Sequence, residues 1–189
     1  MLLLNEQNPP CYRSFDLSKI LLFGNSGSGK SALAKTLCAT HNLAHLDLDT
    51  LAWHPTTPPE RLLLAESKIH MQGFLKAHND WVIEGCYTDL LELAAPYSNK
   101  IIFMNLPVDI CISNAKARPW EPHKYPTKVA QDANLKMLIK WISMYTERVD
   151  TFSETAHSRF YQQYLGNKMC ITSNQRTPEL ILKLGSIND

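Results

Sequence analysis

A stretch of eight residues near the start of the chain combines glycines, a lysine and a hydroxyl side chain in an order that favours phosphate binding. It matches the pattern G-x-x-x-x-G-K-[S/T]. Its members are Gly24, Asn25, Ser26, Gly27, Ser28, Gly29, Lys30 and Ser31. The glycines permit positive φ angles, so backbone N–H groups can turn inward around phosphate oxygens. Lys30 is then expected to reach the β- and γ-phosphates, and the Ser31 hydroxyl to bind magnesium.

The segments on either side of this motif fit the same use. The apolar run 20–23 predicts a buried strand that enters the motif, and 30–41 predicts the helix that leaves it. A helix N-terminus adds partial positive charge where the phosphates would lie. A Gly/Ser turn that merely caps an ordinary helix is the alternative. The flanking strand and helix favour a nucleotide-binding site.

Two carboxylates end the second predicted strand, 44–48. Asp47 and Asp49 are two positions apart, so on an extended strand both would point toward the phosphates. We expect one to bind magnesium and the other to orient or deprotonate an acceptor hydroxyl. A helix-capping or solvated pair of carboxylates is the alternative.

The third predicted strand, 81–84, ends in the same region of such a sheet. Glu84 is a candidate to contact an acceptor hydroxyl or the magnesium shell, and Gly85 would permit close approach of a ligand. A simple strand-ending turn is the alternative. Tyr87 would either stack on a substrate or pack as an interfacial aromatic residue.

A proline-rich segment, 118–126, precedes the longest predicted helix. A flap over a phosphoryl-transfer site needs cations, because charge spreads over the transferring oxygens, and it must exclude water. We assign this role to Arg118, and a surface loop with scattered charges is the alternative. The cationic and aromatic residues of the segment are Arg118, Trp120, His123, Lys124 and Tyr125.

The composition fits one globular domain. The chain has 189 residues, of which 44% are hydrophobic and 20% charged. A net charge of +1 argues against a general nucleic-acid or membrane partner. The five cysteines include no C-x-x-C pair, which is typical of reduced thiols in a cytoplasmic protein. No signal-peptide pattern or bilayer-spanning apolar run is expected.

Strands alternate with helices along the chain, which predicts an α/β fold with an open parallel sheet and helices on both faces. Ligands of such sheets bind at the carboxyl ends of the strands, where the candidate residues would meet. Residues 1–18 are predicted to be a lead-in and 19–189 a single domain. The predicted strands are 20–23, 44–48, 81–84, 100–106 and 168–172. The predicted helices are 30–41, 60–77, 89–95, 108–116, 128–149, 154–165 (capped by Ser153) and 178–184.

These motifs together resemble the small P-loop kinases of the adenylate kinase and shikimate kinase superfamily. The likeness covers most of 19–184 and is nearest to bacterial ATPases labelled adenylate kinase-like or DNA topology modulation proteins. It implies a three-layer P-loop NTPase fold, with a five-stranded parallel sheet in the order 2-3-1-4-5 and a lid over about 118–150. The matching stretches are Gly24–Ser31, His45-Leu-Asp-Leu-Asp-Thr-Leu-Ala-Trp53 and Trp81-Val-Ile-Glu-Gly-Cys-Tyr87.

The resemblance also implies roles for single residues. Asp47 and Asp49 are similar to the D-x-D pair that serves magnesium and the acceptor hydroxyl, and Arg118 falls at the lid arginine. From spacing alone Arg159 and Arg176 read as solvated arginines. The resemblance instead implies that Arg159 contacts the acceptor and that Arg176 belongs to the adenine-binding turn. The family's glycine triplet, its arginine shortly after D-x-D and its second lid arginine have no match here, so the acceptor stays open.

The sequence therefore predicts ATP- and magnesium-dependent transfer of a phosphoryl group to a small molecule, by a monomer or dimer. A regulatory ATPase or switch acting on a macromolecule is the alternative, and a binding-only module is a third reading. We expect catalysis from Lys30, Asp49 and Arg118. ATP would be bound by Gly24–Ser31, Arg118 and Arg176, and the metal by Ser31 and Asp47. The acceptor would be bound by Asp49, Glu84, Gly85, Tyr87 and Arg159.

Overall fold

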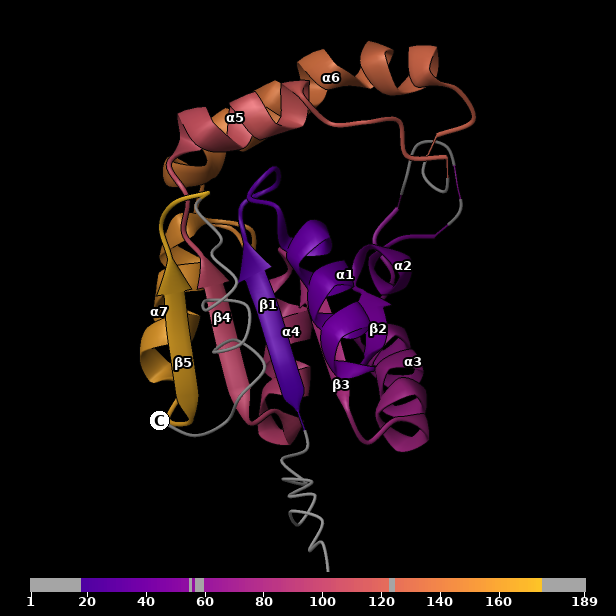
Figure 1. Cartoon of the computed structure of the whole chain (residues 1–189), viewed down its shortest axis with the longest axis vertical. Coiled ribbons are helices and arrows are strands. Elements are labelled where there is room, and N and C mark those ends of the chain that lie inside the picture. Colours follow the sequence, from indigo (N-terminus) through magenta and orange to yellow (C-terminus); the bar gives the residue numbers. More distant parts are fainter. Residues whose placement is uncertain (1–17, 55, 57–59, 123–124, 175–189) are drawn as a thin grey trace, which may run out of the picture.

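The computed structural model describes residues 18–54, 56, 60–122 and 125–174. Within these ranges five parallel strands form one sheet in the order β2-β3-β1-β4-β5, with helices on both faces (Figure 1). The α/β class predicted from the sequence is confirmed, and so is the strand order that the resemblance implied. The strands are β1 (Lys19–Gly24), β2 (Ala44–Asp47), β3 (Trp81–Gly85), β4 (Lys100–Met104) and β5 (Asn167–Ile171).

The predicted helices within the described residues occur in order, 30–41 and 108–116 with the predicted ends and the others with shifted ends, and a short helix at 49–52 was not predicted. The helices are α1 (Lys30–His41), α2 (Asp49–Ala52), α3 (Leu64–Ala77), α4 (Thr88–Ala94), α5 (Val108–Lys116), α6 (Lys128–Ser143) and α7 (Glu154–Gln163), with short 3₁₀ turns η1 (Ala95–Tyr97) and η2 (Met144–Thr146). The Ser153 cap is confirmed, because its side chain accepts a hydrogen bond from Ala156 N. The predicted helix 178–184 lies outside the described residues. Each helix within them is too short or too polar to cross a bilayer.

The central strand β1 is buried on both faces, which explains its unbroken apolar run. Ile20 and Leu22 point to one face, where α1, α5 and α6 pack. Leu21 and Phe23 point to the other, which α2, α3, α4 and α7 cover. There Phe23 stacks on Phe103 with ring centroids 5.0 Å apart. The sheet therefore holds the carboxyl end of β1 rigidly between two apolar layers.

Two predicted helices are shorter than expected, for reasons visible in the backbone. Helix 60–77 starts only at Leu64, because residues 60–62 run back along 52–54 and form an antiparallel bridge between Trp53 and Arg61. Helix 128–149 ends at Ser143, and Arg148 N bonds to Met144 O in the turn that follows. Val149, at the end of the predicted helix, is 95% exposed.

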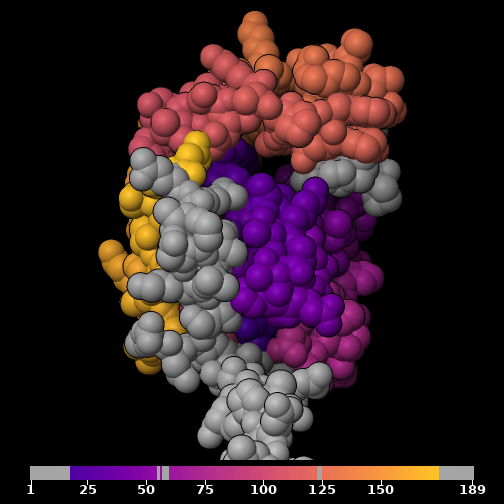
Figure 2. Space-filling model, in the orientation of Figure 1, coloured from indigo at the N-terminus to yellow at the C-terminus, as the bar shows by residue number. Residues whose placement is uncertain are grey.

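Helices α5 and α6 lie across the carboxyl end of the sheet, above the tip of β1 (Figure 1). In the space-filling view they form a layer that overhangs the N-terminal part of the chain (Figure 2). The region predicted as a lid is thus placed over the edge at which ligands of parallel sheets bind.

Candidate functional site

The phosphate-binding motif adopts a backbone that only glycine accommodates. Gly24, Gly27 and Gly29 have φ angles of 141°, 76° and 85°. A Cβ at Gly24 would lie 2.4 Å from Met104 O, and one at Gly27 would lie 2.3 Å from Cys111 O. Gly24 and Gly27 are therefore required both by their dihedral angles and by the close approach of β4 and α5, and Gly29 is favoured by its φ angle.

Lys30 lies inside this loop. Its side chain is buried, and Nζ donates to Gly24 O at 3.1 Å and to Asn25 O at 2.9 Å. Ser28 is fully buried, and its Oγ has no hydrogen-bond partner among the described residues. A buried hydroxyl without a partner is costly, so a phosphate oxygen at this position would relieve the cost. The loop fits the group that its sequence predicts.

Helices α5 and α6 support the loop from outside. Asn25 Nδ2 donates to Ile142 O of α6 at 3.2 Å, and Asn114 Nδ2 of α5 donates to Gly27 O at 2.9 Å. Reasoning from sequence missed Asn114, because nothing marks a lone asparagine on a helix as a partner of a distant loop. These two bonds connect the overhanging layer directly to the phosphate loop.

Glu84 is the buried carboxylate of the site. It lies opposite Asp47 in the β2–β3 register and is 2% exposed. Burial opposes its ionisation, but the His45 imidazole, the Lys30 ammonium and a hydrogen bond from the Ser31 side chain together lower the pKa of Glu84. Its Oε1 has no hydrogen-bond partner in the described part of the chain, and His45 Nε2 is 3.6 Å away. An ionised, incompletely bonded carboxylate beside Ser31 is a chemically suitable magnesium contact.

Gly85 has a different purpose from the one expected. A Cβ there would lie 2.8 Å from Leu48 Cβ, so the space next to this glycine is filled by a buried leucine. Close approach of a ligand at Gly85 is therefore a wrong expectation. The glycine lets the chain after β2 cross over the end of β3, where Leu48 N donates to Glu84 O at 2.8 Å.

Asp47 and Asp49 do not share one face of a strand, and this expectation is wrong too. The strand ends at Asp47, Leu48 turns into the right-handed helical region, and Asp49 begins α2. Asp47 Oδ1 accepts a hydrogen bond from Asp49 N at 2.9 Å, because the turn brings that N–H back over the carboxylate. Asp47 thus lies at the start of the helix, and Asp49 projects from its first turn.

Tyr87 is enclosed by protein and does not offer a face on which a substrate could stack. It is 3% exposed, and its ring packs edge-on against Trp53 and Phe152, with centroids 6.4 and 5.1 Å away. Its hydroxyl lies 2.6 Å from Asp49 Oδ1. The substrate-stacking role is therefore wrong, and the interfacial alternative describes the ring.

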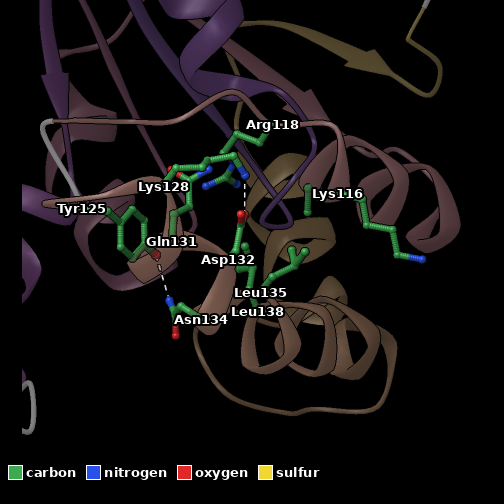
Figure 3. Close-up of a pocket in the computed structure, with 10 residues that line it drawn as sticks. Lys116, Arg118, Tyr125, Lys128, Gln131, Asp132, Asn134, Leu135 and Leu138 are labelled. Atoms are coloured by element: carbon green, nitrogen blue, oxygen red, sulfur yellow. Dashed lines mark hydrogen bonds and ion pairs between the residues drawn. The ribbon is translucent and has the colours of Figure 1, made fainter.

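Arg118 lines a pocket in the region predicted as a lid, among mostly polar side chains (Figure 3). Its Nη1 pairs with Glu121 Oε2 at 2.9 Å, and Gln131 on α6 bonds to Glu121 N and to Pro119 O. The pocket beside it also contains the ion pair of Lys128 and Asp132. To act on a phosphoryl group, the guanidinium would have to leave Glu121.

The family resemblance also assigned roles to Arg159 and Arg176. Arg159 is exposed on α7, whose neighbouring residues His157 and Phe160 point into the sheet. Arg176 lies outside the described residues, as do His123 and Lys124. The structure thus leaves the acceptor role of Arg159 without a supporting contact.

An arginine that the sequence did not single out, Arg61, lies over the ring of Tyr87, the hydrogen-bond partner of Asp49. Arg61 Nη2 pairs with Asp89 Oδ2 at 2.8 Å, and its Cζ lies 4.8 Å from the centroid of Tyr87 and 5.6 Å from that of Phe152. Its position in a segment of prolines and charges carries no periodic signal that could have indicated this contact. Arg61 ties the chain after α2 to the start of α4.

A buried histidine of α7, His157, contacts the backbone of Cys86 directly after β3. His157 Nδ1 lies 2.8 Å from Tyr145 Oη, and Nε2 lies 3.0 Å from Cys86 O. Burial lowers the pKa of His157 to about 4, so the ring is neutral near pH 7. Because a carbonyl only accepts, Nε2 carries the proton and Nδ1 accepts from the tyrosine.

Comparison with solved structures identifies the fold. A gluconokinase from Sinorhizobium meliloti 1021 matches with a TM-score of 0.52 and 14% identity, over 88% of this chain and 89% of that one. A sugar kinase from Janibacter sp. HTCC2649 matches with a TM-score of 0.51 and 12% identity, over 88% and 91%. A shikimate kinase from Acinetobacter baumannii gives 0.48 and 14%, over 89% and 91%.

The chain has the fold of the small P-loop kinases, so the resemblance inferred from its motifs is confirmed at the level of fold. No protein-family model matches the sequence, and no curated protein does. What this particular chain acts on therefore has to be argued from its own residues.

Proposed function

We propose that this protein is an ATP- and magnesium-dependent phosphotransferase that transfers the γ-phosphoryl group to a hydroxyl of a small molecule. The observation that carries the proposal is the meeting of three groups at the carboxyl ends of β1, β2 and β3. They are the glycine loop around Lys30, the buried ionised Glu84 beside Ser31, and Asp49 on the adjoining turn. Kinase relatives in fold support the same reaction class.

The loop supplies the phosphate site. Its backbone N–H groups and the start of α1 favour anionic oxygens. Lys30, now on two carbonyls of its own loop, would exchange them for phosphate oxygens, and the buried Ser28 hydroxyl would gain a partner. Arg118 would add a further cation if the lid network opened.

Ser31 and Glu84 would hold the magnesium ion, with Asp47 beside them in the strand register. Bound magnesium neutralises charge on the β- and γ-phosphate oxygens. This assignment keeps Ser31, moves the role predicted for Asp47 to Glu84, and takes up the magnesium-shell alternative that the sequence left open for Glu84. Asp49, on the first turn of α2, would accept the proton of the acceptor hydroxyl.

The surroundings of Asp49 make the acceptor side distinct from the phosphate side. Arg61 is already paired with Asp89, so an acidic acceptor would have to compete for its guanidinium.

The four described cysteines are free thiols, which fits the cytoplasm, where ATP and phosphorylatable metabolites are found.

A coupled ADP-release assay tests the proposal. Purified protein is mixed with Mg-ATP and, in turn, sugars, polyols, nucleosides, nucleotides and shikimate. We expect one class of hydroxyl compound to raise ADP release. Lys30→Ala should lower turnover by at least about 10³-fold, because its charge is lost from the transferring phosphate. Lys35→Ala, an exposed lysine on α1, is the matched control.

Three results would contradict the proposal. Near-normal turnover by Lys30→Ala would exclude this loop as the site of transfer. ADP release that no small molecule stimulates, but that a protein or DNA accelerates, would favour a regulatory ATPase instead. ATP binding without any turnover would indicate a binding-only module.

A further inference from the structure

Three side chains from neighbouring turns form a hydrogen-bonded series that ends on Asp49. Trp53 Nε1 lies 2.7 Å from Tyr87 Oη, and Tyr87 Oη lies 2.6 Å from Asp49 Oδ1. Asp49 begins α2 and Trp53 follows it, whereas Tyr87 comes from the loop between β3 and α4. The series therefore connects the acceptor side of the site to the strand that carries Glu84.

The chemistry of the donors sets the direction of both bonds. An indole N–H only donates, so the Tyr87 oxygen accepts from Trp53. The phenolic hydrogen is then directed at the Asp49 carboxylate, which accepts. Burial, with Cys86 and Asp49 nearby, raises the pKa of Tyr87 far above its ordinary value, so the phenol keeps this hydrogen at working pH.

The Tyr87 ring is locked by its packing, so its hydroxyl is a fixed point for the carboxylate. Phe152 packs edge-on against the ring at 5.1 Å, and the Arg61 guanidinium lies over it at 4.8 Å. Asp49 itself is exposed at the start of a four-residue helix. A solvent-exposed carboxylate on such a short element needs an external restraint to keep one orientation.

We propose that Tyr87 is a positioning residue for phosphoryl transfer, which holds the Asp49 carboxylate in its productive orientation, and that Trp53 in turn holds Tyr87. The inference rests on the function proposed above for Asp49. In the step itself the acceptor oxygen bonds to the γ-phosphorus. The bond from that phosphorus to the bridging oxygen breaks with its electron pair on ADP. The hydroxyl proton passes to Asp49, and Tyr87 neither gains nor loses a proton.

Tyr87→Phe isolates the hydrogen bond, because it retains the ring and its packing. Turnover is measured as ADP release from Mg-ATP, with the acceptor found by the screen or with water when none is added. We expect kcat to fall about 10- to 100-fold, the range for a hydrogen bond to a charged group, with KM for ATP unchanged. Trp53→Phe acts one bond further away and should cost less, about 3-fold.

A double-mutant cycle separates positioning of Asp49 from a general structural effect. In an Asp49→Asn background, Tyr87→Phe should cause no further loss of kcat, because its effect passes through the carboxylate. Additive losses in the double variant would overturn the proposal. If the wild-type protein is active and Tyr87→Phe has the same kcat, the positioning role is overturned as well, whereas the proposed function stands.

Folding and hydrogen bonding are checked independently of activity. The indole ¹H resonance of Trp53 should shift in Tyr87→Phe, since its acceptor is gone, and an unshifted resonance would contradict the series. Tyr164→Phe is the control, because it removes a phenol that bonds to Ser98 away from the site and should not change kcat. A wild-type protein without ADP release under any condition would overturn the proposed function and this inference together.

Discussion

The proposed phosphate side and the proposed acceptor side of the site are built in different ways. On the phosphate side the groups are contiguous in the chain, from Gly24 to Ser31, and their placement depends on backbone angles and close packing. On the acceptor side Asp49, Tyr87 and Arg61 come from separate segments, and side-chain contacts bring them together. One side is a local structure, and the other is a tertiary assembly.

This difference predicts how each side responds to change. The loop on the phosphate side has glycines at positive φ, with neighbouring atoms too close to admit a methyl group. It therefore cannot accommodate larger side chains at these positions. A tertiary assembly distributes its stability over several weaker contacts, so single changes there should alter orientation before they alter folding. Substitutions on the two sides can therefore test whether the contrast is real.

The largest effect is expected on the phosphate side, from Gly24→Ala. The new methyl group would lie 2.4 Å from the Met104 carbonyl oxygen, at a φ of 141°. We expect the free energy of unfolding in urea to fall by about 4 kcal/mol or more, because strained backbone and central strand must both move. Gly73→Ala on α3 is the matched control, since nothing lies within 4 Å of its added Cβ. Gly73→Ala should raise the free energy of unfolding by about 0.5 to 1 kcal/mol. Equal effects of the two substitutions would disprove the steric argument.

Asp49→Asn should have the largest effect on the acceptor side, and on a different observable. The amide retains the shape of the carboxylate but cannot take up a proton, so turnover should fall about 10²-fold or more. ATP affinity, measured by calorimetry, should be unchanged, because Asp49 lies outside the loop proposed to bind the phosphates. Lost ATP affinity in this variant would show that the two sides are not separable.

The sequence was informative where the signal was local. The phosphate motif and the alternation of strands and helices predicted the fold and the bounds of α1 correctly, because both are set by residues close together in the chain. The relation between Asp47 and Asp49 was predicted wrongly, because the helical turn at Leu48 depends on the backbone of β3. Arg61 and the buried hydroxyl of Tyr87 could not be predicted, since their partners are decided only by the tertiary fold.

The buried His157, which bonds to the Cys86 carbonyl, should make the free energy of unfolding depend on pH. Burial, partly offset by the Cys86 carbonyl, lowers the pKa of His157 from 6.5 to about 4. Between these values the unfolded chain binds a proton that the folded protein does not, so stability falls as pH is lowered through this window. Between about pH 7 and pH 4.5 the loss from this group should be roughly 2 kcal/mol. Urea unfolding at both pH values measures this loss of free energy of unfolding. In His157→Gln the part that comes from His157 should be absent. Equal pH dependence in the two proteins would rule out His157 as the cause.

The smallest effect is expected from Arg61→Met, which tests whether the acceptor side is indeed distributed. Methionine retains much of the apolar stem but loses the ion pair with Asp89 and the contact over the Tyr87 ring. Because the pair is partly exposed, the free energy of unfolding should fall by only about 1 to 2 kcal/mol. The exposed Arg159→Met on α7 is the control and should change stability by less than about 0.5 kcal/mol. If Arg61→Met instead lowered the free energy of unfolding as much as Gly24→Ala is expected to, the acceptor side would depend on one residue, and the contrast between the two sides would fail.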